Sequence, residues 1–135
     1  MTHRILATLA FAAAAGASLP QAANAQAMAG KPMAMPVGHE ETITGTVIDV
    51  SCKFGQGLTG AEHTICAGIC ADKGLPLAIL TADGKLYIPI SPAMPGDAQN
   101  AALKQYAEKK VKVSGKVFTA GGAQAVEITA IAPAA

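Results

Sequence analysis

Lys110-Val-Lys-Val-Ser-Gly-Lys-Val117 alternates polar and apolar residues along its whole length. In an extended chain the three valines and Gly115 lie on one side, and the lysines and Ser114 lie on the other. A period of two is typical of a strand with one face in the protein interior and one face in water. The segment therefore predicts a half-buried β-strand.

Four more strands are indicated on either side of this one. The stretch before the first cysteine is rich in β-branched residues, two short apolar runs flank an Asp-Gly turn, and a last run follows two glycines. The predicted strands are residues 42–50, 77–81, 85–90 and 125–131.

Two short helices are expected between the strands. Thr59 and Glu62 have the spacing of a capping box, in which both side chains bond free backbone amides at a helix start, and this helix extends to about Lys73. Asp97 is suited to cap a second helix that extends to about Lys109. Residues 51–60 are punctuated by glycine and predict a loop.

The order of these elements is three strands, a helix and two strands, with an extra helix after the first strand. This is the order of an OB-fold, a small five-stranded Greek-key barrel. We therefore expect a mainly β domain with two short helices, an OB-fold-like barrel over residues 41–132.

The first 25 residues have the layout of a secretory signal peptide. Arg4 precedes an apolar run from Ile5 to Leu19, and Ala23-Asn-Ala25 supplies a small-residue cleavage site. The run is shorter than the roughly 20 residues that cross a bilayer, so no membrane span is expected, and an uncleaved anchor is the alternative. We expect removal of residues 1–25 and a periplasmic or secreted protein, in a compartment where disulfides form.

Residues 26–40 are rich in Met and Pro and predict a disordered tail. Thioether and imidazole groups are copper ligands, so Met28, Met33, Met35 and His39 favour copper over other metals. The alternative for this segment is a flexible linker without a ligand.

The charge of the exported chain argues against a nucleic-acid partner. Without the leader, nine lysines face nine Asp and Glu residues, and the sequence has two Tyr, three Phe and no Trp. A protein that binds nucleic acid needs a basic surface, and one that grips single strands also uses aromatic side chains for stacking. We expect no nucleic-acid binding.

Three cysteines and a histidine are the candidate metal ligands. His63, Cys66 and Cys70 recur at helical spacing in the first predicted helix, so their side chains leave it in similar directions. Ile65 and Ile69 lie on a neighbouring stripe, which we expect to face the barrel core. Cys52, from the preceding loop, can then approach the Cys/His stripe.

This arrangement supports three states. Cys52 can form a disulfide with Cys66 or Cys70 and leave one free thiol, three sulfurs and the His63 imidazole can bind a metal, or the protein can switch between these states. A disulfide between Cys66 and Cys70 is disfavoured, because residues four apart on a helix hold their Cβ atoms about 5–6 Å apart and a disulfide needs about 3.8 Å. Sulfur ligands select copper(I) or zinc, and the methionines favour copper.

A pattern of residues extends over most of the predicted barrel: Gly45-Thr-Val-Ile-Asp49, Cys52, His63, Cys66, Cys70, Gly74-Leu-Pro76, Asp83-Gly84 and Val113-Ser-Gly115. In this pattern the chain resembles a group of small, exported, largely uncharacterised bacterial proteins with an OB-like barrel. The resemblance implies a barrel and an exported location, but no activity. The Cys66-x-x-x-Cys70 spacing is also similar to the copper-binding pair of Sco-type chaperones of cytochrome oxidase assembly, although here the histidine precedes the pair.

Catalytic functions find little support in the sequence. A c-type haem attachment needs a histidine directly after the second cysteine, where Ala71 stands. A cysteine nucleophile needs a base that a third group orients. His63 could be that base, but the sequence offers only Glu62 and Asp49 as carboxylates to orient it. We therefore expect a non-enzymatic, periplasmic metal-binding accessory protein that has a metal ion and a periplasmic protein as partners. The alternatives are a disulfide-stapled OB-fold module that binds a protein or small ligand, and a thiol redox enzyme.

Overall fold

The computed structural model describes residues 36–135. The predicted signal peptide and most of the predicted tail, with Met28, Met33 and Met35, lie outside the described residues. His39 lies within them, at the start of the first strand, where its Nε2 is 3.1 Å from Glu41 Oε2.

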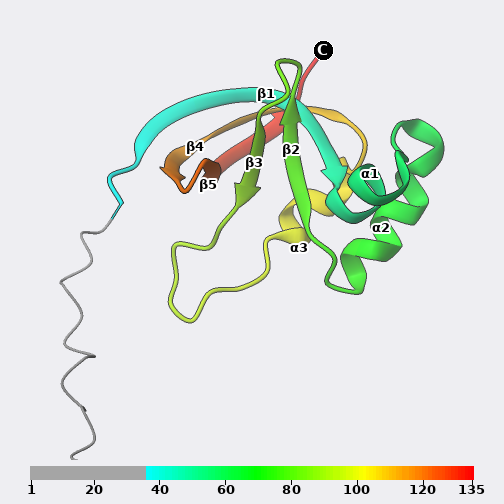
Figure 1. The fold of residues 1–135 in the computed structure, drawn as a ribbon, viewed down its shortest axis with the longest axis horizontal. Coiled ribbons are helices and arrows are strands. Elements are labelled where there is room, and N and C mark those ends of the chain that lie inside the picture. The colour runs from blue at the N-terminus through cyan, green and yellow to red at the C-terminus, as the bar shows by residue number, and fades with distance from the viewer. Residues whose placement is uncertain (1–35) are drawn as a thin grey trace, which may run out of the picture. The chain divides into compact units, whose positions relative to one another are not determined.

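Five strands form a closed barrel in the order β1-β2-β3-β5-β4 (Figure 1). Neighbouring strands are antiparallel except β3 and β5, which are parallel. The predicted mainly β, five-stranded barrel is confirmed. The strands are β1 (His39–Asp49), β2 (Leu77–Thr81), β3 (Leu86–Pro89), β4 (Lys110–Ala120) and β5 (Ala123–Pro133).

The alternating segment at residues 110–117 lies in β4, and its valine face is buried. Val111 and Val113 have no exposed surface, and Val117 is almost completely covered. Gly115 sits at a register shift between β4 and β5, and a Cβ atom there would lie 2.2 Å from the carbonyl oxygen of Glu127. The valines pack against a core completed by Ile43, Val47, Ile79, Tyr87, Leu103 and Val126.

The structure has three short α-helices where the sequence predicts two. The sequence predicts a loop over residues 51–60, but most of this segment forms a helix, α1 (Val50–Gln56). The helix ends at Gly57, which has a left-handed φ of 70°. The predicted helix over 61–73 is a 3-10 turn, η2 (Ala61–His63), followed by α2 (Thr64–Asp72). The predicted capping box is wrong, because η2 begins at Ala61 with Gly60 as its N-cap, and no side chain forms a capping hydrogen bond there.

The second predicted helix is shorter than expected. It consists of α3 (Asn100–Leu103) and a 3-10 turn, η3 (Lys104–Tyr106). It ends early because the next residues bind to β1: Glu108 N donates to Val47 O at 2.7 Å, and Val47 N donates to Lys109 O at 3.1 Å. Backbone pairing with a buried strand therefore replaces the last helical turn.

Helix α2 packs with a different face than predicted. Ala67 and Ala71 are buried, whereas Ile65 and Ile69 are 79% and 51% exposed. The expectation that the isoleucines face the core is wrong. Ala71 belongs to the hydrophobic core, so the alanine face of α2 packs inward in place of the isoleucine face. Helices α1 and α2 lie together at the end of the barrel where β1 finishes (Figure 1).

Candidate metal centre

Cys52 is fixed by the junction of β1 and α1. Asp49, the last residue of β1, caps α1 because its Oδ1 accepts a hydrogen bond from Cys52 N at 3.0 Å. Both residues are buried, Asp49 completely and Cys52 with 6% of its surface exposed. The junction of β1 and α1 therefore places Cys52 in the protein interior.

Helix α2 and the turn before it supply the other predicted ligands. His63 is buried, with 7% of its surface exposed, whereas Cys66 is exposed and Cys70 is partly buried. All three cysteines are free. The three candidate ligands of this segment therefore differ in their exposure to solvent.

The four predicted ligands form two groups that share Cys52. Ligand atoms of Cys52, His63 and Cys66 all lie within 4.8 Å of one another, and those of Asp49, Cys52 and Cys70 do likewise. Asp49 was missing from the predicted set. The structure thus brings the predicted residues to one place, but it separates Cys70 from the histidine side of the cluster.

A buried carboxylate orients the histidine. Glu108 Oε1 lies 3.0 Å from His63 Nδ1, and the Glu108 side chain has no exposed surface. Its other oxygen, Oε2, accepts hydrogen bonds from Thr59 Oγ1 at 2.9 Å and from Gly60 N at 2.8 Å. Thr59 therefore anchors this carboxylate and does not cap a helix.

Glu108 reaches His63 through an unusual backbone conformation. Its φ is +61°, and it is the only described residue other than glycine with a positive φ. A positive φ is uncommon for a residue with a side chain and requires support from surrounding structure. Here that support comes from the backbone bond to Val47 and the three side-chain partners. No motif in the sequence signals this residue, because it lies 45 positions from His63.

The hydrogen bond to Glu108 fixes the tautomer of His63. A carboxylate accepts hydrogen bonds, so Nδ1 carries the proton and Nε2 presents a lone pair. His63 Nε2 is buried and has no hydrogen-bond partner among the described residues. Nε2 is thus the nitrogen available to an ion between Cys52 and Cys66. A carboxylate bonded to the remote nitrogen is the usual support of a metal-binding histidine.

Asp49 controls the other side of the cluster. The Asp49 carboxylate, followed by burial and by Cys52, raises the pKa of Cys70 to about 12. Burial, followed by Asp49, raises the pKa of Cys52. Both thiols are therefore protonated at neutral pH without a metal, and a bound cation would favour deprotonation of a coordinating thiol.

The two buried carboxylates make the protein sensitive to acid. Burial alone would raise the pKa of both Asp49 and Glu108. Hydrogen bonds, first among them the one from Cys52 N, hold the pKa of Asp49 below its ordinary 3.8. Hydrogen bonds from His63 and its neighbours hold the pKa of Glu108 below its ordinary 4.5. A carboxyl with a lowered pKa in the folded state stabilises the protein above its unfolded pKa, and this stabilisation is lost as the pH falls through the folded value. We expect the free energy of unfolding by urea to fall as the pH drops below the ordinary carboxyl values of 4.5 and 3.8 and through the lowered pKa values of the folded protein. Asp49→Asn, which keeps a capping side chain but cannot ionise, should flatten this dependence, and an unchanged slope would contradict the assignment of Asp49.

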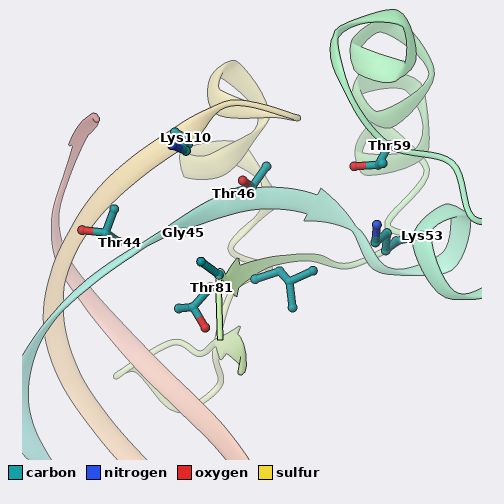
Figure 2. Close-up of a pocket in the computed structure, with 9 residues that line it drawn as sticks. Thr44, Gly45, Thr46, Lys53, Thr59, Thr81 and Lys110 are labelled. Carbon is teal, nitrogen blue, oxygen red and sulfur yellow. The ribbon is translucent and has the colours of Figure 1, made fainter. Parts of the chain in front are cut away.

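A pocket adjoins the cluster on the barrel wall. It has a volume of about 300 Å³ and lies between β1, β2 and α1 (Figure 2). Thr59, which binds Glu108, is one of its lining residues. Its lysines, Lys53 and Lys110, take part in no ion pair among residues 36–135. The other lining residues are Thr44, Gly45, Thr46, Leu80, Thr81 and Ala82.

Within residues 36–135, none of the helices has the length and apolar character that a membrane crossing requires. Comparison of the chain with models of protein families, with curated proteins and with solved structures finds no match.

Proposed function

We propose that this is an exported, periplasmic metal-binding accessory protein that holds one copper(I) ion, or zinc as the alternative, through Cys52, His63 and Cys66. The observation that carries the proposal is His63, which belongs to a ligand group with two cysteine sulfurs and whose buried Nε2 has no hydrogen-bond partner among the described residues. Leaving a buried polar atom unpaired costs about 1–3 kcal/mol. A metal ion at this position would remove that cost.

The ligand types support a soft ion. Two thiolates and one imidazole suit copper(I), which accepts sulfur ligands readily, whereas zinc prefers four ligands and would add water or a further side chain. The exposure of Cys66 gives an ion a route into the site from a partner protein. The methionines of the segment outside the described residues agree with copper handling.

The test is an anaerobic titration of the reduced protein with copper(I) in competition with a chromophoric chelator, followed by the same titration with zinc. We expect one equivalent of copper(I) to bind, with tighter binding than zinc. X-ray absorption of the complex should report sulfur and nitrogen neighbours together. Reduced protein that leaves all metal with the chelator would remove this proposal.

The pocket beside the cluster favours a second candidate, a non-catalytic module that binds a small anionic ligand and is stapled by a disulfide from Cys52. Two lysines without ion-pair partners among residues 36–135 and four threonines line this pocket, and no acidic residue does. Binding of inorganic phosphate that is weakened by Lys53→Met and Lys110→Met but not by Lys112→Met would support it. Equal affinity in all three variants would exclude it.

A further inference from the structure

The three free cysteines differ sharply in their access to other molecules. Cys66 is exposed, and Cys52 is buried with its sulfur within 4.8 Å of the Cys66 sulfur. Thiol and disulfide exchange needs an accessible thiol that attacks and a second thiol behind it that resolves the mixed disulfide. Cys66 is placed to attack an external disulfide, and Cys52 is placed to resolve the mixed disulfide.

We propose that the reduced, metal-free protein exchanges its Cys66 and Cys52 thiols with disulfides of other exported proteins. The Cys66 sulfur attacks one sulfur of the external disulfide, so that a mixed disulfide forms and the first external thiolate leaves. The Cys52 sulfur then attacks the Cys66 sulfur, which breaks the mixed disulfide and releases the second external thiolate. The two thiol protons pass to the two departing thiolates. Two electrons have moved from the protein to the substrate, and a Cys52–Cys66 disulfide remains.

The histidine and Glu108 complete this arrangement. His63 belongs to the same group as both sulfurs, and its Nε2, which has no hydrogen-bond partner among the described residues, can accept the proton of the attacking thiol. Glu108, at 3.0 Å from Nδ1, stabilises the resulting imidazolium. A cysteine nucleophile needs an oriented base, and the sequence suggests only Glu62 and Asp49 as carboxylates beside His63. Glu108 supplies the orienting carboxylate.

The surface around Cys66 is suited to a polypeptide substrate. Ile65 and Ile69, which precede and follow Cys66 in the sequence of α2, are 79% and 51% exposed. Residues four apart on a helix are surface neighbours, so the two isoleucines offer adjoining apolar surface that another polypeptide could cover. Cys70 is less accessible and lies beside Asp49, so it is placed outside the exchange pair.

The experiment uses the full mature chain, reduced and stripped of metal with a chelator, so that its outcome does not depend on metal binding. The probe is glutathione disulfide, and the products are quenched in acid and mapped by mass spectrometry. We expect wild-type protein to form the Cys52–Cys66 disulfide and Cys52→Ser to accumulate glutathione on Cys66. Cys66→Ser should slow the reaction by at least about tenfold, because access governs exchange. Cys70→Ser is the matched control and should react at the wild-type rate.

Two results would overturn the proposal: Cys66→Ser that reacts as fast as wild type, or Cys52→Ser that carries its glutathione on Cys70. Cys66 is exposed, so its serine variant removes no buried contact, and circular dichroism checks its fold. Because metal is absent throughout, exchange without copper binding and copper binding without exchange are separate outcomes. Exchange without copper binding would support this proposal and contradict the proposed metal site. Copper binding without exchange would support the metal site and contradict this proposal.

Discussion

Cys52→Ser and Cys66→Ser are each expected to lower copper(I) affinity by more than about a hundredfold, while Cys70→Ser stays close to wild type. Loss of a residue that merely supports a ligand costs about 10–100-fold in metal affinity, so loss of a ligand should cost more. Cys52 and Cys66 share a ligand group with His63, whereas Cys70 belongs to the group on the Asp49 side. The high pKa of Cys70, about 12, also disfavours its thiolate.

The measurement is competition for copper(I) against the same chelator, with each variant reduced beforehand and checked for its melting temperature. Cys70→Ser is the control, since it removes the same atom from a cysteine whose sulfur also lies within 4.8 Å of the Cys52 sulfur. If Cys70→Ser loses as much affinity as Cys66→Ser, the ion is bound by all three sulfurs. The separation of Cys70 from the group of Cys52, His63 and Cys66 would then hold only in the metal-free protein.

The barrel is predictable from the sequence because its strands carry local signals. Alternation in residues 110–117 places three valines on the buried face, and the structure buries all three. The Asp-Gly turn separates β2 from β3, and Gly121-Gly122 separates β4 from β5. These features depend on residues close together in the chain, so a single sequence contains them.

The packing of α2 and the role of Glu108 depend on distant residues. A hydrophobicity argument directs Ile65 and Ile69 inward, but in its contacts with β1 and η3 the helix α2 buries Ala67 and Ala71 instead. Glu108 was expected on a helix to Lys109, and its pairing with β1 turns it toward His63. Periodicity within a segment cannot report either effect, because both arise from contacts between segments.

Glu108→Gln is expected to lower metal affinity by about 10–100-fold while the fold persists. Oε2 of Glu108 accepts two hydrogen bonds, from Thr59 and from Gly60 N, so the amide oxygen of glutamine would take that position. The amide nitrogen would then face His63 Nδ1 and donate a hydrogen bond to it. Nδ1 would become the acceptor, the proton would move to Nε2, and the lone pair facing the sulfurs would be lost.

Imidazole nitrogen chemical shifts report this change directly, because the two tautomers exchange the protonated position. The matched control is Glu62→Gln, an exposed carboxylate next to His63 in the sequence, which should leave both the shifts and the affinity unchanged. Glu108→Ala should act differently, since it leaves Gly60 N and His63 Nδ1 without partners and lowers stability by about 1–3 kcal/mol for each buried group. If Glu108→Gln binds copper(I) like wild type with the tautomer reversed, His63 is no ligand, and the two sulfurs must bind the ion without it.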